Sequence, residues 1–340
     1  DYTVNYTVRG LSLEESKEII NKRPQLLSLQ EIYRIAESCE PGSEEFNHSF
    51  QVAATMFPDD PIANLNAGAM EIQKGGDMTI AKKHLAKADQ KAAETLNNLG
   101  IIAMIEGDLK TAAGYAQKVL DCGYFELADK SEIEDLVNGV LSPKETIWGV
   151  FSATFYTNVR ANLYLTGNAS CLFLKSDHDD TYLADKEGTD YRYEKWFKNY
   201  SAIEASGMRC IKILDTYELS YSTRPDTRVK GINMLRLPEL YYIITEYYLS
   251  QEKQDEAVKY FDKVLESRGL IGYADRQGAT LTLEKVIQER RKEFICEGQY
   301  FFTQKRYNQS IYEPKSGKLY PASNDIYVFP LPENETEYRY

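Results

Sequence analysis

Two short segments of this 340-residue chain place aromatic rings beside side chains that form hydrogen bonds. They are residues 155–160, with the sequence FYTNVR, and residues 190–196, with the sequence DYRYEKW. A sugar ring stacks its C–H face on an aromatic plane while its hydroxyls need hydrogen-bond partners, so both kinds of side chain suit a carbohydrate site. We therefore predict a ligand-binding surface made of Trp196, Tyr193, Tyr156, Asn158 and Arg160. The alternative is that these rings pack in the core.

The sequence lacks the residue constellations of common enzymes. Its three histidines, His48, His84 and His178, stand in unrelated contexts, and it contains no GxGxxG, P-loop, HExxH or GxSxG motif. No pair of carboxylates can be assigned to glycan hydrolysis. We predict that the protein is not an enzyme, has no catalytic residues and needs no cofactor.

Metal binding is not predicted either. The acidic cluster at residues 176–180, SDHDD, would need glycine at Tyr182 and glutamate at Gly188 to form an EF-hand counted from Asp177. The cysteines are odd in number and form no CxxC pair, which indicates neither a zinc site nor a disulfide framework. We expect buried thiols at most of these positions, which are Cys39, Cys122, Cys171, Cys210 and Cys296.

The charge balance argues against a nucleic-acid partner. Forty Lys and Arg residues oppose 52 Asp and Glu, which gives a net charge of −12 and a pI near 5.0. Such a chain repels phosphates. No apolar run approaches the roughly 20 residues of a membrane-spanning helix, and the N-terminus lacks a basic and hydrophobic signal segment. We expect a soluble, processed chain with a large core.

The C-terminal part shows the 3.6-residue periodicity of amphipathic helices. Apolar residues recur at spacings of three and four within residues 237–248 and again within 257–265, which predicts a helical hairpin of the tetratricopeptide kind. A third helix is expected to begin after Thr282, whose hydroxyl can cap it. In that helix the run Glu289–Glu293 alternates in charge and is expected to form ion pairs on the solvent side.

The N-terminal part repeats at a spacing of about 31 residues, near the roughly 34 residues of a tetratricopeptide unit. The sequences NLNAG at 64–68 and LNNLG at 96–100 each precede a Gly-Asp turn and a helix rich in small residues. Ser12 and Glu15 form a capping-box signature, and residues 2–8 alternate like a strand. We predict two regions. Residues 1–121 contain the strand and the helical repeats, and residues 122–340 form the C-terminal region.

Helical periodicity lapses between these regions. Residues 124–190 are interpreted as long structured loops with short strands at 147–156 and 171–174, and residues 328–332 as part of an extended tail. The predicted fold is therefore mainly α, with tetratricopeptide-like helical repeats and a long irregular insertion of loops and short strands.

Four sequence blocks resemble the C-terminal region of the SusD/RagB family. They are RLPELYYIITEYYL, EAVKYFDKVLESRGL, ERRKEFICEGQYFFTQKR and VFPLP, and they occur in the family's order. The resemblance covers residues 107–340 and includes Asp190–Arg192 and Lys198–Tyr200, so it implies a structural ion pair between Asp190 and Arg192. Before about residue 105 the family's pattern is not recognisable, and the N-terminal part is similar to a tetratricopeptide-like tail of bacterial surface proteins.

The resemblance implies a SusD-like lipoprotein of the outer membrane, exposed at the cell surface. Such a protein captures oligosaccharide or peptide nutrients without cleaving them and delivers them to a SusC-like, TonB-dependent transporter. Its membrane contact would be a lipid on a cysteine upstream of Asp1. The N-terminal similarity keeps a second hypothesis open, a helical-repeat structural or assembly protein that binds another surface protein.

Overall fold

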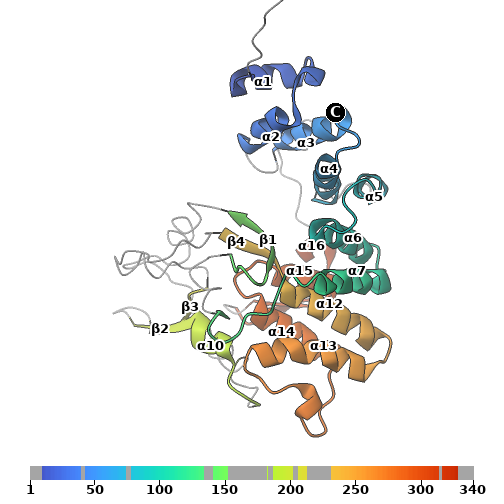
Figure 1. Cartoon of the computed structure of the whole chain (residues 1–340). Helices are drawn as coiled ribbons and strands as arrows, with labels where there is room; N and C mark the ends of the chain where they lie inside the picture. The colour runs from blue at the N-terminus through green and yellow to red at the C-terminus, as the bar shows by residue number, and fades with distance from the viewer. Residues whose placement is uncertain are drawn as a thin grey trace, which may run out of the picture. The chain divides into compact units, whose positions relative to one another are not determined.

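A computed structural model gives the fold of this chain (Figure 1). The residues that it describes are 10–39, 43–73, 78–133, 141–151, 182, 187–201, 206–212, 231–313 and 316–327. They are mostly helical and include only short strands, so the prediction of a mainly α fold is confirmed. None of the described helices has the length and apolar character to cross a membrane. The predicted strands at 2–8 and 171–174 and the tail at 328–332 lie outside the described residues.

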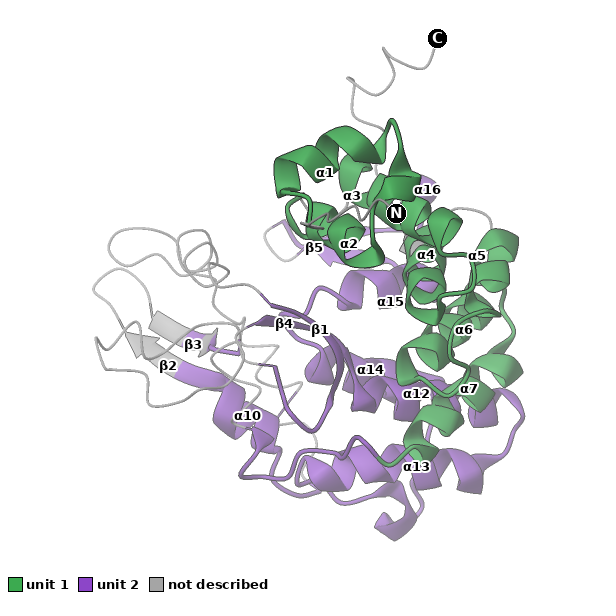
Figure 2. Cartoon of the chain, turned by 45° about the horizontal axis from the view of Figure 1, so that its top comes forward, with its two compact units in different colours: residues 1–123 green, residues 124–340 purple. Residues whose placement is uncertain are grey.

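The chain divides into two compact units, residues 1–123 and 124–340 (Figure 2). The sequence predicts a boundary after residue 121, and this stays a prediction. The helices of unit 1 are α1 (Leu13–Ile20), α2 (Leu29–Glu37), α3 (Glu44–Met56), α4 (Pro61–Gln73), α5 (Met78–Leu85), α6 (Ala93–Ile105) and α7 (Leu109–Asp121), with a 3-10 turn, η1, at Pro24–Leu26.

Small residues allow the helices of unit 1 to pack as antiparallel pairs. Helix α4 packs on α5, and α6 packs on α7. At Gly68 in α4, an added Cβ would lie 2.8 Å from the side chain of Leu85 in α5, so only glycine fits without a shift. The predicted capping box of α1 is present, since the Ser12 side chain accepts from the Glu15 amide and the Glu15 carboxylate accepts from the Ser12 amide.

The described residues of unit 2 form helices and three two-stranded antiparallel ribbons, which pair β1 with β4, β2 with β3, and β5 with β6. Its helices are α10 (Tyr191–Trp196), α12 (Leu237–Ser250), α13 (Gln254–Ser267), α14 (Leu283–Glu293), α15 (Tyr300–Arg306) and α16 (Asn324–Tyr327), with a 3-10 turn, η3, at Tyr273–Asp275. Its strands are β1 (Thr146–Phe151), β2 (Phe197–Ser201), β3 (Ser206–Cys210), β4 (Gly231–Arg236), β5 (Ile311–Glu313) and β6 (Lys318–Tyr320).

Helices α12, α13 and α14 enclose the main core of unit 2. Helix α12 packs against both α13 and α14, which lie beside it in Figure 1. The ring of Tyr242 is fully buried and lies 6.1 Å from the rings of both Phe261 and Phe294, the latter edge-on. The predicted hairpin of residues 237–265 is therefore present. The predicted cap of α14 is present too, since Thr282 accepts from the Lys285 amide.

Candidate ligand-binding face

The ribbon of β1 and β4 has one covered face and one exposed face. Side chains alternate between the two faces of a strand. On the covered face, an added Cβ at Gly149 would lie 2.5 Å from Leu141 Cδ2, and one at Gly231 would lie 3.1 Å from the same atom. Because both positions lack a side chain, Leu141 lies directly against this face and shields it.

Apolar side chains of the same ribbon are exposed. The exposed fraction is 52% for Trp148, 40% for Val150 and 40% for Met234. We call these three side chains the ribbon patch. Trp148 and Val150 share one face of β1, and Ile232, the partner of Val150, lies two residues before Met234 in β4. Grouped exposed apolar side chains usually mark a binding surface, because water contact with them is unfavourable.

Hydrogen bonds fix the base of the ribbon to the rest of unit 2. The Thr146 side chain contacts the Asn233 side chain across the two strands. Gln299, before α15, donates to the Met234 carbonyl over 3.0 Å. The Leu237 amide donates to the Glu145 carbonyl over 2.9 Å. A surface held in this way loses little conformational freedom when a ligand binds.

A connected network of buried charges begins at Arg236, the last residue of β4. We call it the ion network. Among the residues that the structure describes, its members are five positive and five negative groups with side chains at most 8% exposed. They are Arg192, Lys212, Arg236, Arg268 and Lys292 with Glu145, Asp190, Glu289, Glu293 and Glu297. Buried charges are tolerated only when they are paired and hydrogen-bonded, as these are.

Glu293 is the centre of the ion network. Its carboxylate accepts from Arg236 over 2.7 Å, from Arg268 over 2.9 and 3.0 Å, and from Arg192 over 3.2 Å. Burial alone would raise the pKa of Glu293, but the guanidinium groups of Arg268 and Arg236 hold it well below its usual value. The carboxylate is therefore ionised, and it joins helix α14 to the ends of α13 and β4.

The prediction that the run Glu289–Glu293 faces solvent is wrong. Glu289, Arg290, Lys292 and Glu293 are all buried. Their partners come from distant parts of the chain, such as Asp190 and Arg192, which a count of helical spacings cannot identify. The predicted ion pair between Asp190 and Arg192 is confirmed, with 2.8 Å between Arg192 Nη2 and Asp190 Oδ2.

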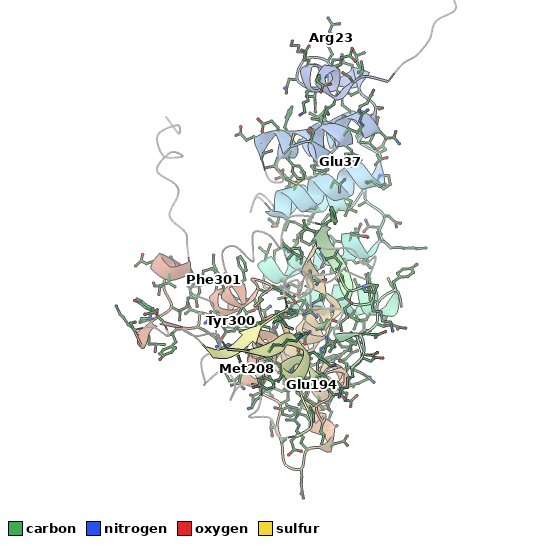
Figure 3. The ribbon with its side chains drawn as sticks, turned by 90° about the vertical axis from the view of Figure 1, so that its left-hand side faces the viewer. Arg23, Glu37, Glu194, Met208, Tyr300 and Phe301 are labelled. Carbon is green, nitrogen blue, oxygen red and sulfur yellow. The ribbon has the colours of Figure 1, made fainter. Side chains whose placement is uncertain are left out.

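Of the five side chains predicted to bind a ligand, the structure describes Trp196 and Tyr193. The indole of Trp196 is fully buried, donates from Nε1 to the Ile133 carbonyl over 3.2 Å, and lies under the Lys212 ammonium. The partly buried ring of Tyr193 packs 5.8 Å from the ring of Phe197. Met208 of β3, labelled in Figure 3, packs on the same cluster.

Tyr156, Asn158 and Arg160 lie outside the described residues. Ligand binding by the five residues stays a prediction. The alternative for each ring is packing in the core, and the fully buried indole of Trp196 fits that alternative.

Trp148 is the candidate that the sequence prediction missed. The sequence predicts a short strand at residues 147–156, and β1 covers the first part of that range. The signal available in the sequence was the alternation of Trp148, Gly149 and Val150, in which a glycine stands between two large side chains. Alternation separates the two faces of a strand, but it does not say which face Leu141 covers.

Unit 1 contains a separate cavity of about 630 Å³ between its first helices. Its lining includes Lys17 and Ile20 of α1, Ile35 of α2, and Glu44 and His48 of α3. Among the residues with described positions in both units, no three His, Cys, Asp or Glu side chains are grouped to hold a metal ion.

Solved structures with a similar fold are SusD-like proteins. A SusD superfamily protein from Bacteroides thetaiotaomicron aligns with a TM-score of 0.62 at 16% identity, over 95% of this chain and 83% of its own. A SusD-like carbohydrate-binding protein from Bacteroides vulgatus gives 0.59 at 14% identity, over 92% and 82%. Surface glycan-binding protein A from Bacteroides uniformis gives 0.54 at 13% identity, over 91% and 81%.

The sequence itself also matches a known family. Among curated proteins no match is found. The sequence model of the SusD family, in contrast, matches residues 151–338, which is more than half of the chain. The blocks that resembled this family lie within or beside the matched range, and the structural relatives belong to the same group. This protein belongs to the SusD family.

Proposed function

We propose that this protein binds glycans at the cell surface and that the ribbon patch forms part of the binding site. Membership of the SusD family and the names of two structural relatives, one carbohydrate-binding and one glycan-binding, support a glycan ligand. The half-exposed indole of Trp148 is the observation that supports this position for the binding site. It stands on a ribbon that Arg236, at the end of β4, joins to the ion network.

The chemistry of the patch suits a sugar chain. The face of Trp148 offers an aromatic plane for the C–H face of a sugar ring, and Val150 and Met234 extend the apolar surface. The insertion between β1 and β4 begins at residue 152 and includes the predicted residues Tyr156, Asn158 and Arg160. In this proposal the predicted polar groups supply hydrogen bonds to the sugar hydroxyls.

The Trp148→Ala variant tests the proposal. Loss of one stacked ring costs about 1–3 kcal/mol on the scale known for aromatic stacking, so we expect the glycan Kd to rise about 5- to 150-fold. A glycan array identifies the ligand, and calorimetric titration measures its affinity. Phe302→Ala is the matched control, because Phe302, at 65% exposed, is at least as accessible as Trp148 but lies on α15.

Two further variants separate loss of ligand stacking from loss of core packing. Trp148→Phe keeps an aromatic plane and should retain most of the affinity. Trp196→Ala should lower stability by about 3–5 kcal/mol through a core cavity, with affinity unchanged in the folded fraction. Equal affinity in wild type and Trp148→Ala would remove the ribbon patch from the site. An array without any glycan ligand, together with recovery of a surface-protein partner, would instead favour the assembly hypothesis.

We propose that the bound glycan passes unmodified to a SusC-like, TonB-dependent transporter, and that a lipid upstream of Asp1 anchors the protein in the outer membrane. A peptide ligand is the less favoured alternative. Incubation of the bound glycan with purified protein should yield no cleavage products, whereas product formation that persists after repurification would contradict capture without catalysis.

A further inference from the structure

Two cysteines of unit 2 lie against each other although they are far apart in the sequence. Cys210 is the last residue of β3, and Cys296 follows the end of α14. Their thiols are in hydrogen-bonding contact. Neither thiol forms a disulfide in this structure.

Contacts on either side hold these two segments together. The Lys212 ammonium donates to the Glu293 carbonyl over 2.8 Å and forms an ion pair with the Glu297 carboxylate. Ile295 packs against the cluster of buried residues that contains Cys210. Residues that flank each cysteine are thus fixed to the opposite segment, so the closeness of the thiols does not depend on the rotamer of one side chain.

The two cysteine residues differ in exposure to solvent. Cys210 is 7% exposed, whereas Cys296 is an exposed residue. The hydrogen bond with Cys296, together with burial, raises the pKa of the Cys210 thiol well above its usual value. An external oxidant therefore reaches Cys296 first, and Cys210 is placed to react second.

We propose that Cys210 and Cys296 form a disulfide when the protein meets a low-molecular-weight disulfide oxidant. The Cys296 thiolate attacks one sulfur of the oxidant, which forms a mixed disulfide and releases one thiolate. The Cys210 thiolate then attacks the Cys296 sulfur and expels the second thiolate. Two protein thiols are oxidised, one external disulfide is reduced to two thiols, and the two protein protons pass to those thiols.

The bond would join the β2–β3 ribbon covalently to the end of α14. It would close a loop that contains β4, α12, α13 and α14, and closing so long a loop restricts the unfolded chain strongly. We expect oxidation to raise the Tm of unit 2 by on the order of 10 °C. The other described cysteines, Cys39 and Cys122, lie in unit 1, where each thiol donates to a carbonyl of its own helix.

Peptide mapping tests the disulfide. Reduced protein is incubated with oxidised glutathione, denatured, alkylated and digested without reductant. We expect a cross-linked peptide that joins Cys210 to Cys296, and the raised Tm should return to the reduced value after treatment with dithiothreitol. Stable glutathione addition at Cys296 without the cross-link would overturn the proposal, as would a cross-link from Cys210 to any other cysteine.

Variants separate the bond from other effects of oxidation. Cys296→Ser removes an exposed thiol with little effect on packing and should abolish the Tm rise. Cys122→Ser should retain it, because Cys122 lies in unit 1. A Tm rise of equal size in Cys296→Ser and wild type would show that the stabilisation has another origin.

Discussion

At the scale of single residues, the centre of unit 2 depends on one carboxylate. Glu293 has a fully buried side chain and accepts hydrogen bonds from three arginines. Replacing a buried ion pair with apolar groups is often tolerated, but removing one partner leaves an uncompensated buried charge. Glu293 is therefore expected to be more sensitive to substitution than Glu284, the exposed acid of the same helix.

We expect Glu293→Gln to lower the free energy of unfolding by about 3–5 kcal/mol, because the guanidinium groups of Arg192, Arg236 and Arg268 lose their shared negative partner. Urea denaturation measures the difference. Glu284→Gln is the matched control, since Glu284 is exposed on α14 and its substitution should change stability by at most about 0.5 kcal/mol. Similar values for both variants would contradict the assignment of Glu293 as the centre of the network.

The pH dependence of stability follows from the same residue. The folded state holds the pKa of Glu293 well below its ordinary value of 4.5. The stabilisation is complete above 4.5 and is lost as the pH falls from there through the lowered folded pKa, since protonation then removes the negative charge. Glu293→Gln should therefore show a flatter decline of stability below pH 4.5 than wild type. A steeper decline would contradict this sign.

At the scale of elements, the β1–β4 ribbon depends on the glycine that begins β4. A Cβ added to Gly231 would lie 2.3 Å from the Val150 carbonyl oxygen, which is backbone and cannot rotate away. Substitution must therefore move the strands apart. The ribbon patch stands on these strands, so its geometry should change with them.

We expect Gly231→Ala to destabilise unit 2 by about 1–3 kcal/mol through overpacking and to weaken glycan binding at the ribbon patch. Thermal melting and calorimetric titration measure the two effects. Gly114→Ala, on the exposed side of α7 with no atom within 4 Å of the added Cβ, should instead stabilise its helix by up to about 1 kcal/mol. Unchanged melting of Gly231→Ala would show that the strands adapt without cost.

At the scale of the whole molecule, local signals in the sequence were sufficient for most helices. The capping residues Ser12 and Thr282 and the apolar stripes of α12 and α13 act within a few neighbouring residues, and these predictions match the structure. The burial of Glu289–Glu293 was missed, because it depends on partners about 100 residues away along the chain. The exposure of Trp148 was missed for a similar reason, since it depends on which ribbon face Leu141 covers.

The neutrality of the ion network has a consequence for folding cooperativity. Its ten charges come from separate segments around Glu145, Asp190, Lys212, Arg236, Arg268 and Glu293. A partly folded form in which one segment has not docked would hold desolvated charges without partners, so such forms are strongly disfavoured.

We therefore expect unit 2 to unfold in a single steep transition. Both tryptophans, Trp148 and Trp196, lie in unit 2, so intrinsic tryptophan fluorescence reports on this unit alone, whereas the helical circular dichroism signal reports on both. A fluorescence transition with two resolved steps would show that some of the charged segments can separate while the others remain folded. A single step would mean that the segments that carry the ribbon patch and the helices beneath it form one cooperative unit.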